Sequence, residues 1–406
     1  MLARVFRAFR YRDFRLMWLG ACVSSIGTWM QSTAQSWLIY DLSNRSELLG
    51  LDRFLGEIPI VLLSLFGGVL ADRVNRRYIL LGSQFLQMLC ATILTSLLVM
   101  GVISKVHPIV WPILILSFFV GIAQAFGGPA YSALVPSLVD KEDLPNAISL
   151  NSIQFNLARV IGPALGGAAL ANLGAAWCFG INAVSYVAVI ATLLIVRPAF
   201  IPKATSAGVF ESMRQGIDFV RTRAAMVPLI ALTFSMTFLS VTLLQFLPVF
   251  AREVLHEDAK AFTILLIASG LGSVSGALIV AGFARRRGLG RPSLIILATL
   301  GLLTVAFSYS RTLWLCVAIV FLCGACLISM FAMVMSMVQS IIPDEMRGRV
   351  MSVYNLSLRG GMPLGALLSG YLIPHFTLPV VLAWNGVLLV VLAVYFWMVH
   401  PDVAAL

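Results

Sequence analysis

Charged residues are scarce in this chain. They make up 11% of its 406 residues, whereas 60% of the residues are hydrophobic. A soluble domain carries about 25% charged residues, so this chain has too little charge to cover a surface that faces water. The scarcity excludes a soluble enzyme, a DNA-binding protein and a disordered regulator.

The sequence also lacks the motifs of catalysis and nucleotide binding. Its six cysteines lie in apolar segments, and its four histidines follow no zinc-binding spacing. No lysine follows a glycine, which excludes a Walker A loop, and there is no Gly-x-Ser-x-Gly elbow. We therefore expect no enzymatic activity, no metal and no cofactor.

Apolar runs dominate what is present. Twelve of them reach the roughly 20 residues that a helix needs to cross a bilayer. They lie at 14–40, 48–71, 78–100, 109–131, 147–173, 176–196, 226–250, 262–284, 293–309, 313–341, 350–373 and 378–399. The predicted fold class is an all-α membrane protein with twelve transmembrane helices.

The positive charge is distributed unevenly between these runs. The chain has a net charge of +11, and of its 28 lysines and arginines 20 fall on the side of the N-terminus, 5 on the opposite side and 3 inside runs. Cytoplasmic loops carry such an excess. We predict a multi-pass protein of the bacterial inner (plasma) membrane with both termini in the cytoplasm, in contact with lipid and not with nucleic acid.

The chain has the organisation of a duplicated protein. A six-helix half at 1–196 precedes a cytoplasmic linker at 197–225, which contains an amphipathic helix, and a second six-helix half follows at 226–406. Ser, Arg and Pro recur at an offset of 200 between runs five and eleven, and an Asn recurs at an offset of 203 between runs six and twelve. Two such halves are the architecture of many secondary transporters.

One sharp motif follows run two, at residues 68–77. Its members are Gly68, Asp72, Arg73, Arg76 and Arg77. It resembles the loop 2–3 signature of the major facilitator superfamily, which implies a cytoplasmic gate whose aspartate docks on the positive end of another helix. The expected partner is the start of run eleven, near residues 347–349. Asn75 replaces a glycine of the signature and is expected to keep the turn because Asn tolerates a left-handed backbone. The alternative is that the arginines only anchor the loop in the cytoplasm.

A second motif lies in run five. It comprises Arg159, Gly162, Pro163, Gly166 and Gly167. It is similar to the Gly-Pro-x-x-Gly-Gly signature of antiporters in the same superfamily. Small residues at this spacing let two helices approach closely, and the proline favours a kink. Simple helix packing remains the other interpretation.

The whole chain resembles the drug:proton antiporter-3 branch, which includes macrolide efflux proteins and the enterobactin exporter. Phe-Arg-Leu-Met-Trp-Leu-Gly at 14–20, Ala-Tyr-Ser-Ala-Leu-Val-Pro at 130–136 and Arg-Gly-Arg-Val-Met-Ser at 347–352 carry this resemblance. It implies a major facilitator fold and export of a small molecule, but it indicates no particular cargo.

Ionisable residues inside the runs are candidates for proton coupling, because a buried charge in a membrane is costly. Asp52 and Glu57 are the acidic residues that fall clearly within a run, and Arg53 lies one helical turn before Glu57. We predict that Glu57 binds the coupling proton and that Arg53 is its alternate partner. A permanent ion pair between Arg53 and Glu57 is the alternative.

Polar stripes on three runs are candidates for the wall of a substrate cavity. The residues are Thr28, Gln31, Gln35, Thr237, Ser352, Asn355 and Arg359. Polar faces in lipid-embedded helices point towards protein or water, although hydrogen bonds between helices would explain them equally.

The sequence favours a secondary active transporter that exports a drug, siderophore or other amphiphilic metabolite by alternating access, in exchange for protons. We expect it to act as a monomer. The alternatives are an uptake symporter or facilitator and, less favoured, a membrane sensor or enzyme that transports nothing.

Overall fold

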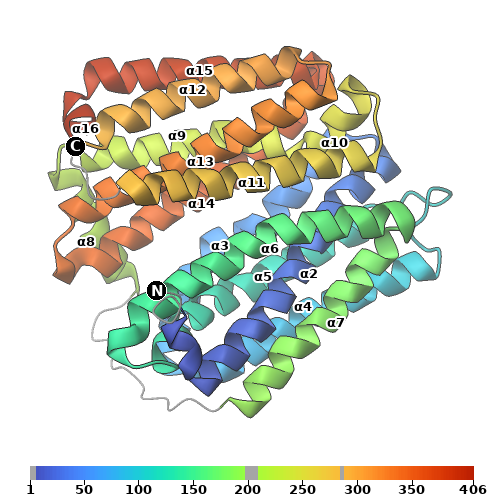
Figure 1. Cartoon of the computed structure of the whole chain (residues 1–406), viewed down its shortest axis with the longest axis horizontal. Helices are drawn as coiled ribbons and strands as arrows, with labels where there is room; N and C mark the ends of the chain where they lie inside the picture. Colours follow the sequence, from blue (N-terminus) through green and yellow to red (C-terminus); the bar gives the residue numbers. More distant parts are fainter. Residues whose placement is uncertain (1–5, 197–208, 284–287) are drawn as a thin grey trace. The chain divides into compact units, whose positions relative to one another are not determined.

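The computed structural model describes residues 6–196, 209–283 and 288–406. These residues form helices and turns and contain no strand, which confirms the predicted all-α fold class (Figure 1). The chain divides into two compact units. Unit 1 comprises Met1–Asn44 and Leu55–Ser206, and unit 2 comprises Arg45–Phe54 and Ala207–Leu406.

Unit 1 contains six long helices and a short N-terminal turn. They are η1 (Arg7–Arg10), α2 (Arg12–Ser43), α3 (Ser46–Arg73), α4 (Arg76–Val99), α5 (Trp111–Leu134), α6 (Leu144–Asn172) and α7 (Ala175–Ile195). Two 3-10 turns, η2 (Val135–Ser137) and η3 (Lys141–Asp143), join α5 to α6. Helix α2 packs against α6 and α7, and α4 packs against α5 and α7. The start of α3, as far as Phe54, belongs to unit 2.

Unit 2 repeats this arrangement with a different set of helices. They are α8 (Val209–Thr222), α9 (Met226–Gln245), α10 (Leu247–Val249), the π-helical turn η4 (Phe250–Val254), α11 (Ala259–Phe283), α12 (Gly290–Tyr309), α13 (Leu313–Ile341), the 3-10 turn η5 (Asp344–Met346), α14 (Arg347–Phe376), α15 (Leu378–Val399) and α16 (Pro401–Ala405). The main packing pairs are α9 with α14, α11 with α13 and α12 with α15.

Many of these helices suit a bilayer. In the part of the chain that the structure describes, nine helices are long and apolar enough to cross a membrane. Helices α2, α6 and α14 are of similar length, with 32, 29 and 30 residues, but none of them contains an uninterrupted stretch as apolar as those of the nine. The chain is therefore a multi-pass membrane protein, while the count of twelve spans stays a prediction.

In each unit, glycines bring an equivalent pair of helices together, α2 with α6 in unit 1 and α9 with α14 in unit 2. In unit 1, a Cβ at Gly162 of α6 would lie 2.9 Å from the carbonyl oxygen of Ile26 on α2. In unit 2, a Cβ at Gly361 of α14 would lie 2.6 Å from the carbonyl oxygen of Phe234 on α9. One turn later, Gly166 meets the backbone of Met30 on α2, just as Gly365 meets the backbone of Phe238 on α9. Small residues thus allow the same close approach of backbones twice.

The register of this packing differs from the register counted in the sequence. Gly162 and Gly361 are 199 residues apart, as are Gly166 and Gly365, whereas the Ser, Arg and Pro matches are 200 apart. One residue turns a helix by about 100°. Arg159 and Arg359 therefore do not occupy equivalent positions in the two units.

Helix α9 is interrupted near its C-terminal end. It stops at Gln245, and a π-helical turn at Phe250–Val254 follows Leu247–Val249. Pro248 lies in this break, and a proline cannot donate the backbone hydrogen bond that a continuous helix requires. The predicted run at 226–250 is thus a broken helix.

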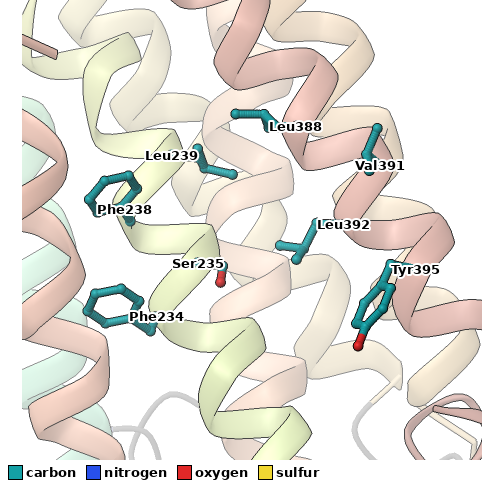
Figure 2. Close-up of a pocket in the computed structure, with 8 residues that line it drawn as sticks. All are labelled: Phe234, Ser235, Phe238, Leu239, Leu388, Val391, Leu392 and Tyr395. Atoms are coloured by element: carbon teal, nitrogen blue, oxygen red, sulfur yellow. The ribbon is translucent and has the colours of Figure 1, made fainter. Parts of the chain in front are cut away.

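An apolar groove lies between α9 and α15 in unit 2. It has a volume of about 340 Å³ and is lined by Phe234, Ser235, Phe238, Leu239, Leu388, Val391, Leu392 and Tyr395. Figure 2 shows the two phenylalanines on one side and the α15 residues across the groove. The rings of Phe234 and Phe238 stack with centroids 6.0 Å apart.

The amphipathic helix of the linker is α8, and it packs against α14. Gly216 makes this contact, because a Cβ there would lie 2.6 Å from the carbonyl oxygen of Arg349. Val220, one turn later on the same face, is buried. The apolar face of α8 is therefore at least partly covered by protein at the start of α14.

Candidate functional site

The gate-loop motif (residues 68–77) spans the turn between α3 and α4. Asn75 caps α4, because its Oδ1 accepts a hydrogen bond of 3.1 Å from the backbone N–H of Arg77. Its φ of −58° is not left-handed, so the expected left-handed backbone at Asn75 was wrong and helix capping explains the asparagine. Gly68 has open space around it, and the close helix contact falls on Gly67, which approaches the carbonyl of Ala125.

Two arginines of the gate loop bind the ends of neighbouring helices. Arg76 Nη1 donates to the carbonyl of Ala133 near the end of α5, at 2.7 Å. Arg77 donates through Nε to Leu193 and through Nη2, at 3.0 Å, to Leu194, both at the end of α7. Cations at helix C-termini are stabilised by the helix dipole. These arginines thus hold α5 and α7 against the start of α4.

The remaining gate-loop residues are more exposed. Asp72 Oδ1 lies 3.7 Å from Arg76 Nη2, and the aspartate side chain is 35% exposed. Arg73 is exposed at the end of α3. Docking of Asp72 at residues 347–349 stays a prediction.

A buried carboxylate, which sequence reasoning missed, joins the N-terminal turn to the loop before α6. The side chain of Asp143 is 1% exposed and binds Arg7 Nε at 2.9 Å and Arg10 Nη2 at 2.8 Å. The hydroxyl of Tyr11 donates to the same carboxylate at 2.9 Å. Loss of water around the Tyr11 phenol raises its pKa. We call Arg7, Arg10, Tyr11 and Asp143 the N-terminal clamp.

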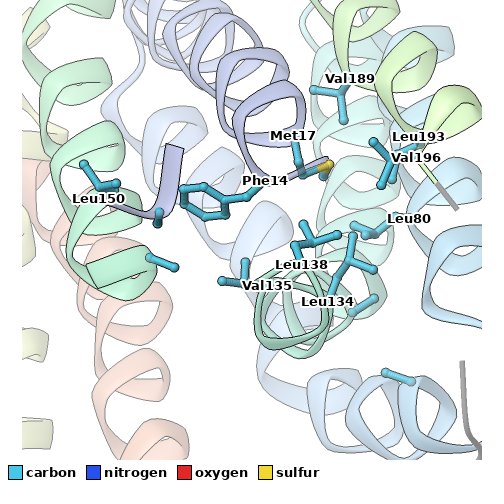
Figure 3. Packing of buried hydrophobic residues seen from close by; sticks show 14 residues of the cluster. Phe14, Met17, Leu80, Leu134, Val135, Leu138, Leu150, Val189, Leu193 and Val196 are labelled. Carbon is cyan, nitrogen blue, oxygen red and sulfur yellow. The ribbon is translucent and has the colours of Figure 1, made fainter. Parts of the chain in front are cut away.

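A hydrophobic cluster lies beside the clamp in unit 1, because Ala8 belongs to it and Tyr11 packs against it. Figure 3 shows the cluster. Its residues come from η1, from α2, α3, α4, α5, α6 and α7, and from the loops beside them. They include Phe14, Met17, Leu80, Leu134, Val135, Leu138, Leu150, Val189, Leu193 and Val196. The clamp and the gate-loop arginines therefore surround an apolar core that holds the helix ends together.

The antiporter-type motif is a backbone contact between α6 and α2. Gly162, Pro163, Gly166 and Gly167 are buried. Arg159, one turn before Gly162 and Pro163, lies over the ring of Trp29 on α2, with its Cζ 5.8 Å from the centroid. The geometry accounts for the glycines by packing, and the link to antiport stays a prediction.

The three ionisable residues of α3 lie in its first half. Asp52 is 9% exposed and Glu57 is half-buried. Arg53 Nη2 lies 4.0 Å from the sulfur of Met362 on α14. Glu57 stands between Gly56 and Pro59, where Gly121 of α5 approaches the carbonyl of Gly56 closely. Glu57 thus sits in a turn of α3 that is packed against another helix.

The polar stripe on α2 takes part in hydrogen bonds inside unit 1. Asn182 Nδ2 on α7 donates to Gln31 Oε1 at 2.6 Å, and the hydroxyls of Thr28 and Tyr186 are 3.3 Å apart. Gln35 Nε2 donates to the hydroxyl of Ser117 on α5 at 2.9 Å.

This network continues across the unit through residues that the sequence analysis did not select. The hydroxyl of Tyr186 lies 3.4 Å from Gln87 Oε1 on α4, which also accepts a bond of 3.0 Å from Gln124 Nε2 on α5. Gln87 is buried and Gln124 is half-buried. Amides inside apolar runs are rare and mark such networks, so scanning for single amides would have found them.

The predicted cavity residues of unit 2 fall into two groups. Thr237 is buried, and its hydroxyl donates to the carbonyls of Thr233 and Phe234 on its own helix. Asn355 and Arg359 are exposed on α14, and Ser352 is half-buried on the same side. Their contribution to a cavity wall stays a prediction.

A further pocket lies in unit 1, where α5 ends and α6 begins. Its volume is about 470 Å³, and its lining includes Tyr131, Asn151 and Phe155. Among the described residues, no group of three or more His, Cys, Asp or Glu side chains is placed to hold a metal ion.

Comparison with known proteins identifies relatives of the whole chain. A family model described as transmembrane secretion effector, of the major facilitator type, matches residues 3–404. The staphyloferrin A transporter of Staphylococcus aureus is 27% identical over 84% of this chain and 85% of its own length. The enterobactin exporter of Salmonella typhimurium is 25% identical over 88% of this chain and 84% of its own length. Macrolide efflux protein A of Streptococcus pyogenes is 22% identical over 89% of this chain and 90% of its own length.

Solved structures share the fold. The nucleoside transporter NupG aligns with a TM-score of 0.71 at 16% identity and covers 95% of this chain and 98% of its own. A bacterial homologue of the iron transporter ferroportin, in an inward-facing state, aligns with a TM-score of 0.71 at 17% identity. The alignment covers 95% of this chain and 99% of that protein. The predicted major facilitator fold is confirmed.

Proposed function

Because this chain belongs to the transmembrane secretion effector family of major facilitator transporters, we propose that it exports an amphiphilic small molecule from the cytoplasm in exchange for protons. Relatives that cover most of the chain are named for efflux of macrolides and for export of enterobactin. These names are the observation that carries the direction of transport. The proposal includes no enzymatic step and no cofactor, and the proton motive force supplies the energy.

The orientation follows from the charge distribution. The gate loop and the N-terminal clamp bring many arginines to one end of unit 1, and an excess of cations is typical of the cytoplasmic side. We place both termini in the cytoplasm and the protein in the inner membrane. One copy of the chain contains both units, so we expect the monomer to carry out transport.

The packing supports transport by alternating access. In each unit, two glycines hold a pair of helices at backbone contact, so each pair is expected to move as one body rather than to slide. In this proposal the two units move against each other during transport, and the aspartate of the gate loop holds one end closed.

Glu57 is the proposed proton carrier. It is an acidic residue of an apolar span, half-buried in α3 beside Pro59, and a carboxylate there is costly unless it serves a function. Arg53 lies four residues earlier in the helix and is the proposed partner of the ionised form. The proton would bind Glu57 from the outside and leave it towards the cytoplasm.

The test measures accumulation of a macrolide, enterobactin and staphyloferrin A in cells with and without the protein, each with and without a protonophore. Lower accumulation of at least one compound, abolished by the protonophore, is the expected result. Higher accumulation would favour the uptake symporter instead, and equal accumulation of every compound would leave the export proposal without support.

A further inference from the structure

The pocket between the end of α5 and the start of α6 combines aromatic and polar walls. Its volume of about 470 Å³ falls within the range of about 300–1,000 Å³ that small-molecule sites occupy. Among the residues that the structure describes, no charged side chain lines it. We propose that this pocket binds the uncharged, hydroxyl-bearing part of an amphiphilic molecule.

The polar groups of the pocket have unused hydrogen-bonding capacity. The hydroxyl of Tyr131 on α5 donates to Asn151 Oδ1 on α6 at 3.2 Å, which fixes the orientation of the amide. The Nδ2 of Asn151 then has no partner within the described ranges, and its two N–H groups remain available as donors. This bond therefore leaves the amide N–H groups of Asn151 as donors for a ligand.

The other polar groups offer acceptors. The hydroxyls of Ser132 and Ser152 donate to carbonyls of their own helices, at 3.1 Å each, and their oxygens keep free lone pairs. Asn156 Nδ2 donates to the carbonyl of Ser152 at 2.8 Å, which leaves its Oδ1 as an acceptor. A ligand with several hydroxyl or amide N–H groups would satisfy this set.

Phe155 and Ile148 of α6 contribute to the apolar part of the pocket. Phe155 is 52% exposed and Ile148 is 54% exposed. The rings of Phe155 and Trp29 pack edge to face, with centroids 6.0 Å apart and an angle of 71° between their planes. A fixed aromatic ring provides a surface for an apolar or aromatic skeleton.

The absence of charge among the described lining residues determines the class of ligand. An ionised group placed here would lose water without gaining a counter-ion from these residues, which disfavours its binding. An uncharged skeleton that carries hydroxyls, such as a phenolic ester, avoids this cost. That the ligand is a cargo rests on the proposed export function, whereas the binding itself does not.

The test uses the purified protein in lipid nanodiscs with single added cysteines, Ser152→Cys in the pocket and Ser149→Cys as the matched control. Ser149 lies on the same helix, outside the pocket lining, and makes the same kind of bond, to the carbonyl of Pro145. The rate of maleimide labelling is measured with propyl gallate, which has three phenolic hydroxyls, and with propyl benzoate, which has none. Parent protein gives the background from the native cysteines.

Propyl gallate at about ten times its dissociation constant is expected to slow labelling of Ser152→Cys about tenfold, to leave Ser149→Cys unchanged, and to lose this effect when Asn151→Leu is added. Equal protection by propyl benzoate would show a site for apolar chains, such as those of lipids, and would overturn the proposal. Equal protection at both cysteines, or none at Ser152→Cys, would also overturn it. The assay involves no transport, so a failure of export leaves its result unaffected.

Discussion

The two adjacent glycines of α14 make the packing argument testable with a single methyl group. A Cβ at Gly360 would have the ring of Phe234 as its nearest neighbour, at 3.9 Å, an ordinary contact. A Cβ at Gly361 would lie 2.6 Å from the carbonyl oxygen of Phe234 and 3.0 Å from the backbone nitrogen of Phe238. The backbone of α9 would have to move to admit it.

The expected magnitude follows from these contacts. Alanine is more favourable than glycine in a helix interior by about 1 kcal/mol, and both variants gain this term. Gly361→Ala also incurs the cost of overpacking, about 1–3 kcal/mol. The free energy of unfolding should therefore be lower for Gly361→Ala than for Gly360→Ala by about 1–3 kcal/mol.

The assay is thermal unfolding of the purified variants in the same detergent, followed by tryptophan fluorescence. At about 1 °C per kcal/mol for a chain of 406 residues, Gly361→Ala should melt about 1–3 °C below Gly360→Ala. Equal melting temperatures would refute the conclusion that the glycine contacts set the distance between α9 and α14.

Three further predictions concern the helix ends of unit 1. Arg77→Ala should lower the free energy of unfolding by about 1–2 kcal/mol, because the end of α7 loses its charged hydrogen bonds; urea titration measures this loss, and an unchanged midpoint would argue against the capping role. Asp143→Asn should lower the free energy of unfolding by about 1–3 kcal/mol, since two arginines lose a buried counter-ion. Asp140→Asn, at an aspartate with a 75% exposed side chain, should lower it by less than about 1 kcal/mol. Similar losses in melting temperature for the two variants would contradict this contrast. The raised pKa of Tyr11 means that the folded state favours the neutral phenol, so the stabilising contribution of Tyr11 is present below pH 10 and is lost as the pH rises above 10. Above pH 10, the melting temperature of Tyr11→Phe should therefore decline less steeply than that of the parent protein. Parallel declines would refute this role of Tyr11.

Local patterns in the sequence were sufficient to predict most of the helices. The apolar runs predicted the all-α membrane fold, and the spacing of Gly162 and Gly166 predicted a close helix contact that the structure shows against Ile26 and Met30. The apolar runs and the glycine spacing are patterns of residues that are close together along one helix, so they can be recognised in the sequence itself.

The features that the sequence did not reveal depend on residues far apart in the chain. The clamp joins Arg7 to Asp143, and the network of unit 1 joins Gln87 to Tyr186; no local period marks such pairs. The capping role of Asn75 was missed because the family pattern suggested a glycine-like turn at a position that the structure uses as a helix cap.

The central claim is that export is coupled to protons through Glu57. Purified protein in liposomes that contain a trapped pH dye, with a gradient of a compound that the accumulation assay identifies, tests it most directly. Glu47→Gln is the matched control, because Glu47 lies on the same helix with a side chain 34% exposed beside Arg45. The account predicts that the compound's gradient drives protons the opposite way in parent and Glu47→Gln protein, and that Glu57→Gln abolishes this proton movement but retains exchange of labelled for unlabelled compound. Undiminished proton movement in Glu57→Gln would contradict the account.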